Sequence, residues 1–347
     1  MGQYVRNAWY PAAWSREVGR SLVACRILEE DLVLYRLESG AVAALEDVCP
    51  HRLAPLSVGR LVGDRVVCGY HGLEFDCTGR CARVPFQPLI PPGARVRAYP
   101  VHENLGLVWI WMGDPARARV EDVFDLPQYH REGWWPVEGD ALTIACSYLS
   151  LADNLCDPVH VAWVHGSTLG NAAAEAIPVQ HEQRSENEIV TWRWILDAPA
   201  IPLFREFCGY GEHTDRWHYY HYHAPSIAII DFGTARTGSG APEGRRDDCA
   251  QIYSCHFITP VDESHCVDRW LFVNNFPTDA AKAEAMRVAL RGAFDEDKFI
   301  LEAIQRNQER TGRRPMKLSI DASPVLMRRM IERRIQAEAG VAAGSAA

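Results

Sequence analysis

Two cysteines and two histidines are grouped in a short stretch of the first quarter of the chain. The segment CPHRLAPLSVGRLVGDRVVCGYHGLEF contains Cys49-x-His51 and, after a gap of sixteen residues, Cys68-x-x-His71. Thiolates and imidazoles are usual protein ligands of zinc and of iron–sulfur clusters. These four residues therefore predict a metal centre, and the way they are paired indicates which one.

The mixed pairing favours a [2Fe–2S] cluster over a structural zinc site. Zinc modules usually bring together close pairs of one ligand type. Here each close pair holds one cysteine and one histidine, so each loop can supply one ligand to each of two irons. Gly69 and Gly72 would let backbone N–H groups approach the sulfides. The nearby Cys77 and Cys81 need no metal, because a hairpin turn around Gly79 explains their closeness.

A second group of candidate ligands lies in LADNLCDPVHVAWVHG. It contains His160 and His165, preceded by Asp153, Asn154 and Asp157. On a helix Asp153 and Asp157 share one face, and Asp157 lies three residues before His160. Two imidazoles and one carboxylate make the facial triad of non-haem Fe(II) oxygenases, which leaves positions for O2 and solvent. A capped helix with two surface histidines is the alternative, and the upstream cluster favours the iron site.

Further polar side chains lie in segments that are typical of strands. Alternation along HYYHYH puts His221 and His223 on one face and His218 on the other, so we expect an ordinary strand rather than a third metal site. Asp231 in IAIIDFGTA and His256 in YSCHFITP lie among apolar residues, where each needs a partner. They are either substrate contacts or structural residues bonded to neighbouring strands.

The elements that must position these residues fall into two regions. Residues 1–115 read as short strands joined by hairpins, with turn signals at Ser39-Gly40 and Gly63-Asp64. Residues 116–140 are expected to form a linker. Residues 141–337 combine strands with helices, and the periodicity from Leu149 to His165 predicts a helix.

One or two further helices are expected near the C-terminal end. The segment after Thr278, a candidate N-cap, has helical composition, and Gly312 lies beyond its end. The second region is therefore an antiparallel sheet flanked by helices. Residues 338–347 are small and are expected to be a disordered tail.

Composition excludes several classes of protein. The 347 residues are 48% hydrophobic and carry a net charge of −9, which argues against nucleic-acid binding. We find no signal peptide and no apolar run of membrane-spanning length, so we expect a cytoplasmic protein without a membrane partner. The eleven cysteines are then expected to serve as metal ligands and buried thiols rather than disulfides.

Taken together, CPHRLAPLSVG, CGYHGLEF and DNLCDPVHVAWVH resemble the oxygenase (alpha) component of the Rieske non-haem iron oxygenases. The similarity is to the subgroup of vanillate O-demethylase, dicamba O-demethylase and toluenesulfonate methyl-monooxygenase, and it runs from VRNAWYPAAW to PVLMRRMIERRI. The resemblance implies an α+β chain, with an N-terminal all-β Rieske [2Fe–2S] domain and a C-terminal helix-grip (START-like) catalytic domain. These motifs are specific for the family but do not identify a substrate.

The resemblance also implies the ligands of both centres. The cluster would be held by Cys49, His51, Cys68 and His71. The mononuclear iron would be held by His160, His165 and a carboxylate from the segment AFDEDKFILEAI. Within that segment we expect Asp297, with Asp295 and Glu296 as alternatives.

Other positions match functional residues of the family. Asp157 matches the bridging aspartate, and Asn154 matches a polar residue near the iron. Asp231 and His256 match positions that line the pocket of the dicamba-demethylating relative. One departure is the tripeptide CDP at 156–158, where Met-Asp-Leu is more usual, because its proline leaves the local helix geometry open.

The resemblance implies a terminal oxygenase in a multicomponent system. Electrons from NAD(P)H would arrive through a separate flavin/iron–sulfur reductase, in some systems with a ferredoxin, and O2 would be the co-substrate. A substituted aromatic compound would be hydroxylated or demethylated. The expected assembly is a head-to-tail homotrimer in which His71 of one chain meets Asp157 of the next. The alternatives are a ring cis-dihydroxylating dioxygenase, an iron–sulfur electron carrier and a zinc-stabilised binding module.

Overall fold

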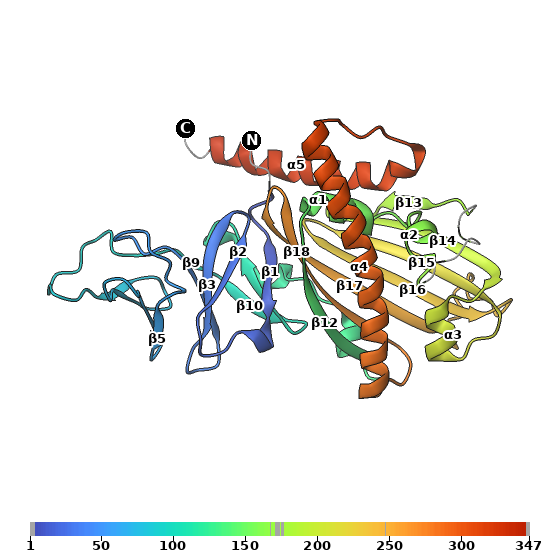
Figure 1. The fold of residues 1–347 in the computed structure, drawn as a ribbon, viewed down its shortest axis with the longest axis horizontal. Coiled ribbons are helices and arrows are strands. Elements are labelled where there is room, and N and C mark those ends of the chain that lie inside the picture. Colours follow the sequence, from blue (N-terminus) through green and yellow to red (C-terminus); the bar gives the residue numbers. More distant parts are fainter. Residues whose placement is uncertain (1–3, 167, 171–173, 175–176, 247, 345–347) are drawn as a thin grey trace. The chain divides into compact units, whose positions relative to one another are not determined.

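The computed structural model describes residues 4–166, 168–170, 174, 177–246 and 248–344. The chain divides into two compact units (Figure 1). The N-terminal unit comprises residues 4–125 and 259–262, and the C-terminal unit comprises residues 126–258 and the chain from Glu263 onward. All eleven cysteines are free thiols.

The N-terminal unit is built from short antiparallel strands, as the sequence predicts. They form three small sheets with the orders β1-β11-β10, β2-β3-β4-β9 and β5-β6-β7-β8. The strands are β1 (Trp9–Trp14), β2 (Val23–Ile27), β3 (Glu30–Arg36), β4 (Val42–Glu46), β5 (Arg60–Val62), β6 (Arg65–Val67), β7 (Glu74–Phe75), β8 (Cys81–Arg83), β9 (Ala98–Tyr99), β10 (Val101–Asn104) and β11 (Leu107–Trp111), with a 3-10 turn η1 (Ser15–Glu17).

The predicted hairpins are confirmed. Ser39-Gly40 lies between the paired strands β3 and β4, and Gly63-Asp64 lies between β5 and β6. The turn that contains Gly79 joins β7 to β8, which accounts for the closeness of Cys77 and Cys81. Strands β3, β4, β6, β7 and β8 contribute to an apolar core whose fully buried members include Val33, Tyr35, Leu45, Leu56, Val66 and Phe75.

The segment expected to be a linker is only partly irregular. Three 3-10 turns, η2 (Pro115–Arg117), η3 (Val120–Asp122) and η4 (Pro127–His130), are followed by strand β12 (Trp135–Ile144), which pairs with β18. The prediction of a linker up to 140 is therefore wrong for its last residues. A tertiary contact accounts for the glycine in this strand. A Cβ atom at Gly139 would lie 2.4 Å from the indole ring of Trp270 on β18, so only glycine allows the two strands to approach this closely.

The C-terminal unit contains a seven-stranded sheet of order β12-β18-β17-β16-β15-β14-β13, in which sequence neighbours from β13 to β18 lie side by side. The remaining strands are β13 (Gln180–Gln183), β14 (Glu188–Pro199), β15 (His213–His223), β16 (Ile227–Arg236), β17 (Ala250–Asp262) and β18 (His265–Asn274). The helical elements are α1 (Tyr148–Leu155), α2 (Val161–Val164), α3 (Pro202–Cys208), α4 (Ala280–Thr311), η6 (Ser319–Asp321) and α5 (Ala322–Gly344).

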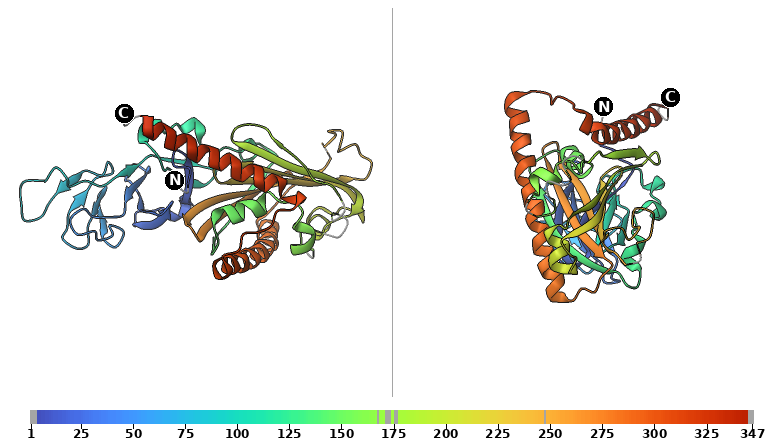
Figure 2. Two further views of the ribbon diagram at one scale, coloured as in Figure 1. Left: turned by 90° about the horizontal axis from the view of Figure 1, so that it is seen from above. Right: turned by 90° about the vertical axis from the view of Figure 1, so that its right-hand side faces the viewer.

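The long helix α4 crosses one face of this sheet, and α5 lies along its β13–β14 edge (Figures 1 and 2). The carboxylate of Asp279 accepts a hydrogen bond from the Lys282 amide, so the N-cap is Asp279 rather than the expected Thr278. Helix α4 ends as expected before Gly312, which has a φ of +62°. The tail expected to be disordered from 338 belongs to α5 as far as Gly344, because alanine has the highest helix propensity. Residues 345–347 lie outside the described part of the chain.

The single helix expected from Leu149 to His165 is interrupted. Helix α1 stops at Leu155, and α2 begins only at Val161. Pro158 lies between them, and its ring and missing N–H are incompatible with a continuous helix. The interruption places the two histidines at either end of α2, with His160 before its first residue and His165 after its last.

Candidate metal centres and the adjoining cavity

The two loops that carry the first centre have the same hydrogen-bond pattern. In one, the Cys49 amide donates to the Ala54 carbonyl at 2.9 Å, and the Leu53 amide donates back to the Cys49 carbonyl at 2.9 Å. In the other, Cys68 donates to Leu73 at 2.8 Å and receives a bond from Gly72 at 3.0 Å. The same pair of backbone hydrogen bonds therefore shapes both loops, each of which carries one cysteine and the histidine after it.

The equivalent turn positions of the two loops are Leu53 and Gly72, with φ values of +58° and +73°. A left-handed conformation is natural for glycine but unusual for leucine. The side chain of Leu53 is 72% exposed, so its position is not explained by packing in the core. The unusual backbone is consistent with a functional constraint on the loop.

The loops bring the four predicted ligands together. Cys49 and Cys68 are buried, and burial, together with the neighbouring Cys68, raises the pKa of the Cys49 thiol. His51 is exposed and His71 is half-buried, and their ring centroids are 4.6 Å apart. Two inner thiols and two outer imidazoles fit a [2Fe–2S] cluster in which one iron takes sulfur ligands and the other nitrogen ligands.

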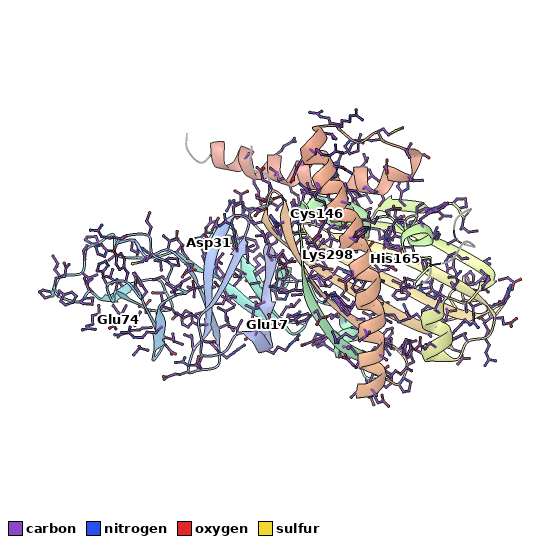
Figure 3. The ribbon with its side chains drawn as sticks, in the orientation of Figure 1. Glu17, Asp31, Glu74, Cys146, His165 and Lys298 are labelled. Carbon is purple, nitrogen blue, oxygen red and sulfur yellow. The ribbon has the colours of Figure 1, made fainter. Side chains whose placement is uncertain are left out.

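The second centre joins α2 to α4. Ligand atoms of His160, His165 and Asp297 all lie within 4.8 Å of one another. The Nε2 atom of His165 is 3.1 Å from Asp297 Oδ2, and that of His160 is 3.5 Å from Asp297 Oδ1. Figure 3 shows His165 beside α4, the helix that carries the carboxylate. This donor set fits a divalent iron with open positions.

The three consecutive acidic side chains at positions 295–297 of α4 point in different directions. Asp295 is half exposed and binds Arg291, whereas Asp297 is buried between the histidines. Glu296 lies behind His165, with its Oε2 atom 2.8 Å from Nδ1. The structure therefore brings Asp297 to both histidines, and it gives Glu296 a position that the sequence did not predict.

Hydrogen bonds and charges fix the Asp297 carboxylate. Burial opposes its ionisation, but the hydrogen bond from His165, the charges of both histidines and the amide of Asn154 lower the pKa of Asp297 overall. Asn154 Nδ2 donates to Oδ1 at 2.9 Å. For His165, burial lowers the pKa, and the two carboxylates raise it above its usual value. Asn154 therefore lies beside the candidate iron site.

Asp157 lies on the outer side of His160. Its Oδ2 atom is 3.8 Å from His160 Nδ1, which has no hydrogen-bond partner among the described residues. Its Oδ1 atom accepts a bond from the Val159 amide at 2.7 Å and is thereby held at the α1–α2 break. Asp153 is directed elsewhere, to Arg328 of α5 at 2.6 Å.

A mainly apolar cavity adjoins the three ligands. Its lining residues are Asn154, Leu155, His160, Val161, His165, Leu169, His218, Tyr220, Ile230, Phe232, Ser254, His256, Leu290, Phe294 and Asp297. Of the two expected pocket residues, His256 lines the cavity, with Nδ1 2.8 Å from Asp268 and Nε2 3.1 Å from Ser254.

Asp231 does not line the cavity, so the expectation of a substrate contact there is not supported. The neighbours Ile230 and Phe232 point into the cavity, and alternation sends Asp231 to the opposite face of the sheet. There its carboxylate accepts hydrogen bonds from Trp217 Nε1 and Gln251 Nε2, both at 2.8 Å. Burial raises the pKa of Asp231, although these two bonds oppose the rise.

Two buried arginines lie on the same face of the sheet as the cavity residue His218. Arg193 donates to the carbonyls of Pro158 and Ala174. Burial, with a contribution from Arg193, lowers the pKa of Arg216 to about 10. Burial and both arginines hold the pKa of His218 well below its usual value, so this imidazole is neutral. Its Nδ1 atom has no hydrogen-bond partner among the described residues.

Comparison with protein families matches both units. Residues 8–100 match the Rieske [2Fe-2S] domain, and residues 144–337 match the vanillate O-demethylase oxygenase C-terminal domain. No helix in the described part of the chain is long and apolar enough to cross a membrane.

Known proteins match over nearly the whole chain. The iron–sulfur subunit of a toluene-4-sulfonate monooxygenase system from Comamonas testosteroni is 36% identical over 343 residues, covering 97% of this chain and 99% of the relative. The oxygenase component of dicamba O-demethylase from Stenotrophomonas maltophilia is 33% identical, with coverages of 97% and 99%. A crystal structure of dicamba monooxygenase bound to 3,6-dichlorosalicylic acid superposes with a TM-score of 0.87 at 33% identity, covering 97% of this chain and 99% of that one. The chain therefore belongs to the Rieske non-haem iron oxygenases, as an oxygenase alpha component of the subgroup that contains the vanillate and dicamba O-demethylases and the toluenesulfonate monooxygenase.

Proposed function

We propose that the chain hydroxylates a methyl group of a substituted aromatic compound, using O2 and electrons supplied by a separate reductase. The observation that carries this proposal is the group of His160, His165 and Asp297, which opens on an apolar cavity within the same unit. Iron bound there would supply the activation of O2. The reaction consumes one O2, two electrons and two protons, and yields one hydroxymethyl group and one water.

The product depends on the atom that carries the methyl group. Hydroxylation of an O-methyl gives a hemiacetal, which breaks its C–O bond to release formaldehyde and the phenol. Hydroxylation of an aryl methyl gives a stable alcohol. Demethylation and methyl hydroxylation are therefore the same chemistry on different substrates. The apolar cavity wall formed by Leu155, Phe232 and Phe294 suits the aromatic ring of a methoxy- or a methyl-substituted substrate.

The protein's own residues position this chemistry. Glu296 would hold the His165 ring through Nδ1 and leave Nε2 for iron, as carboxylate–histidine pairs do in other metal sites. Asn154 would hold the Asp297 carboxylate in the same way. Burial of Asp297 and the apolar cavity wall would keep bulk water from the reacting atoms.

We further propose that the substrate is an anionic aromatic, a carboxylate or a sulfonate. Neutral His218 offers an N–H donor on the cavity wall, and the buried cations Arg193 and Arg216 lie on the same face of the sheet as His218. A buried positive field favours an anion. The relatives act on toluene-4-sulfonate and dicamba, and dicamba monooxygenase was crystallised with an aromatic acid bound.

Electrons are proposed to pass between chains of a head-to-tail homotrimer. The N-terminal unit exposes apolar side chains beside the cluster ligands, including Leu53 and Tyr70, which are 72% and 62% exposed. The C-terminal unit has a groove lined by Asp157, Pro158 and Val159 together with residues around Ile177 and Ile320. A second copy of the chain can insert the first surface into the second, and a heterologous contact that closes makes a ring.

The proposal is tested with a reconstituted system. The purified protein, a surrogate flavin/iron–sulfur reductase and NADH are incubated with methoxy- and methyl-substituted benzoates and benzenesulfonates, and with neutral analogues of the same rings. We expect substrate-dependent NADH and O2 consumption, with formaldehyde from the methoxy compounds. A cis-diol product would instead identify a ring dioxygenase, and cluster reduction without any product would identify an electron carrier.

A further inference from the structure

We propose that Glu188, His221 and His223 form an additional site for a divalent cation of the zinc type, separate from the iron site. One ligand atom from each of the three residues lies within 4.8 Å of the other two. Two imidazoles and one carboxylate are a donor set that binds zinc and its neighbours in the first transition row, with a water molecule as the fourth ligand.

Strand geometry creates this site, and the proposal departs from the expectation, based on the sequence alone, that HYYHYH is an ordinary strand without a metal. His221 and His223 are two positions apart on β15, so they project from the same face of the sheet. Glu188 opens the neighbouring strand β14 and is the direct register partner of His223. The Nδ1 atom of His221 already lies 3.1 Å from Glu188 Oε1. Three donors from two paired strands are thus collected without any rearrangement of the backbone.

The imidazole rings are held in a regular stack. His221 and His223 lie at an interplanar angle of 5° with centroids 6.4 Å apart, and Tyr219 continues the stack below His221. Trp192 of β14 stacks in turn on Tyr219 at 2°. Aromatic neighbours that fix the ring planes reduce the ordering needed when a metal binds.

The backbone at this end of the strands is also fixed. The Ala224 amide donates to the Asn187 carbonyl at 2.8 Å, and Arg334 of α5 contacts the Asn187 side chain and the Ala224 carbonyl. The side chains of Glu188 and His221 remain 23% and 20% exposed, so an ion and its water can reach them.

The site is distinct from the iron centre. His218 lines the cavity on one face of β15, and His221 and His223 lie on the other face. A bound ion would fasten the first residue of β14 to the last residues of β15, at the end of this strand pair opposite to α3. Loss of the ion should therefore lower thermal stability without removing the iron or the cluster.

The test is zinc binding by the full-length holoprotein. Zinc chloride is titrated calorimetrically, and zinc and iron are counted by elemental analysis after desalting. We expect one zinc per chain, unchanged iron content and a rise in the melting temperature. Changes to the surroundings of a metal ligand cost about 10–100-fold in affinity, so His221→Ala and His223→Ala should each weaken zinc binding by at least about 100-fold. Glu188→Gln should give a smaller loss, because it keeps the shape but removes the charge.

The matched control is His213→Ala. His213 lies on the same strand and has its own carboxylate contact, to Asp197 at 3.2 Å, but it offers a single imidazole. This variant should bind zinc as the parent does. An Asp297→Ala background, in which the other centre lacks its carboxylate, should also keep the zinc. The proposal is overturned if the parent binds no zinc, if zinc persists in both histidine variants, or if Asp297→Ala abolishes it.

Discussion

The Nδ1 atom of His165 lies 2.8 Å from the carboxylate of Glu296, on the side of the ring away from Asp297. Consecutive residues of a helix point about 100° apart. Glu296 and Asp297 nevertheless contact the same imidazole, because the His165 ring lies between the two side chains. One carboxylate faces the metal side of the ring, and the other faces the outer nitrogen.

The first prediction concerns this outer carboxylate. Glu296→Gln keeps the hydrogen-bonding reach but removes the charge that favours metal binding through Nε2. We expect mononuclear iron affinity to fall by about 10–100-fold while the cluster is retained. Iron content and visible absorption measure the two effects. Asp295→Asn, on the exposed face of the same helix, should leave both unchanged, and equal losses in the two variants would contradict the role.

The second prediction separates the two centres. Asp297→Ala removes the only carboxylate that contacts both His160 and His165 among the described residues. The purified variant should lose its mononuclear iron and its turnover while it keeps the red-brown absorption of the cluster. The reciprocal variant, His51→Cys, should lose the Rieske absorption and EPR signal. Normal iron content and turnover in Asp297→Ala would exclude this residue as a ligand.

Local spacing carried much of the information about the cluster loops. Cys49 and His51 are two residues apart, and the turn residue Leu53 follows two residues later, so a short stretch of sequence contains the whole predicted ligand pair. The proposed iron ligand on α4 is different, because Asp297 is far from His165 in the chain. Spacing could not choose among three consecutive acidic residues, and only the resemblance favoured Asp297.

Strand register explains the errors that remain. Alternation correctly separated His218 from His221 within one strand. It could not say which faces of β16 and β17 meet the cavity, so it could not distinguish Asp231 from His256, although of these two only His256 lines the cavity. The start of β12 was missed for a similar reason, since its partner strand β18 lies far away in the sequence.

A third prediction follows from the position of Asp231. Burial raises the pKa of Asp231 in the folded state. The buried charge therefore lowers the stability of the protein once the pH rises above the ordinary pKa of an aspartate. Asp231→Asn can still accept the bonds from Trp217 and Gln251. We expect a gain on the order of 1 kcal/mol, or a melting temperature roughly 2–4 °C higher at pH 7, with no gain near pH 3 and unchanged KM. A large rise in KM would instead show that Asp231 contacts the substrate.

The fourth prediction tests the anion preference of the cavity. His218→Gln preserves a neutral N–H donor, whereas His218→Leu removes it. For an aromatic carboxylate we expect kcat/KM to fall by about 10–100-fold in the leucine variant and far less in the glutamine variant. The loss should appear mainly in KM. For a neutral analogue of the same ring, kcat/KM should change equally in both variants. If kcat/KM for the carboxylate also changed equally in both variants, His218 would have no role in recognising the anion.

The last prediction concerns Asp157 and the path of the electrons. Its carboxylate lies 3.8 Å from the outer nitrogen of His160, a distance at which a small shift would make a hydrogen bond. We expect that bond to form when His71 of a neighbouring chain docks against the same carboxylate. Asp157→Asn should then keep both metals and the trimer yet lose nearly all turnover, because the charge that fixes both imidazoles is gone.

A mixing experiment tests transfer between chains directly. Subunits carrying His51→Cys, with a dead cluster, are combined with subunits carrying Asp297→Ala, with a dead iron site. Neither homotrimer should turn over. In mixed trimers, verified by differently tagged subunits, an intact cluster faces an intact iron site across some of the interfaces, so partial activity should return. Transfer within a single chain would leave every mixed trimer inactive, because no subunit then holds both working centres.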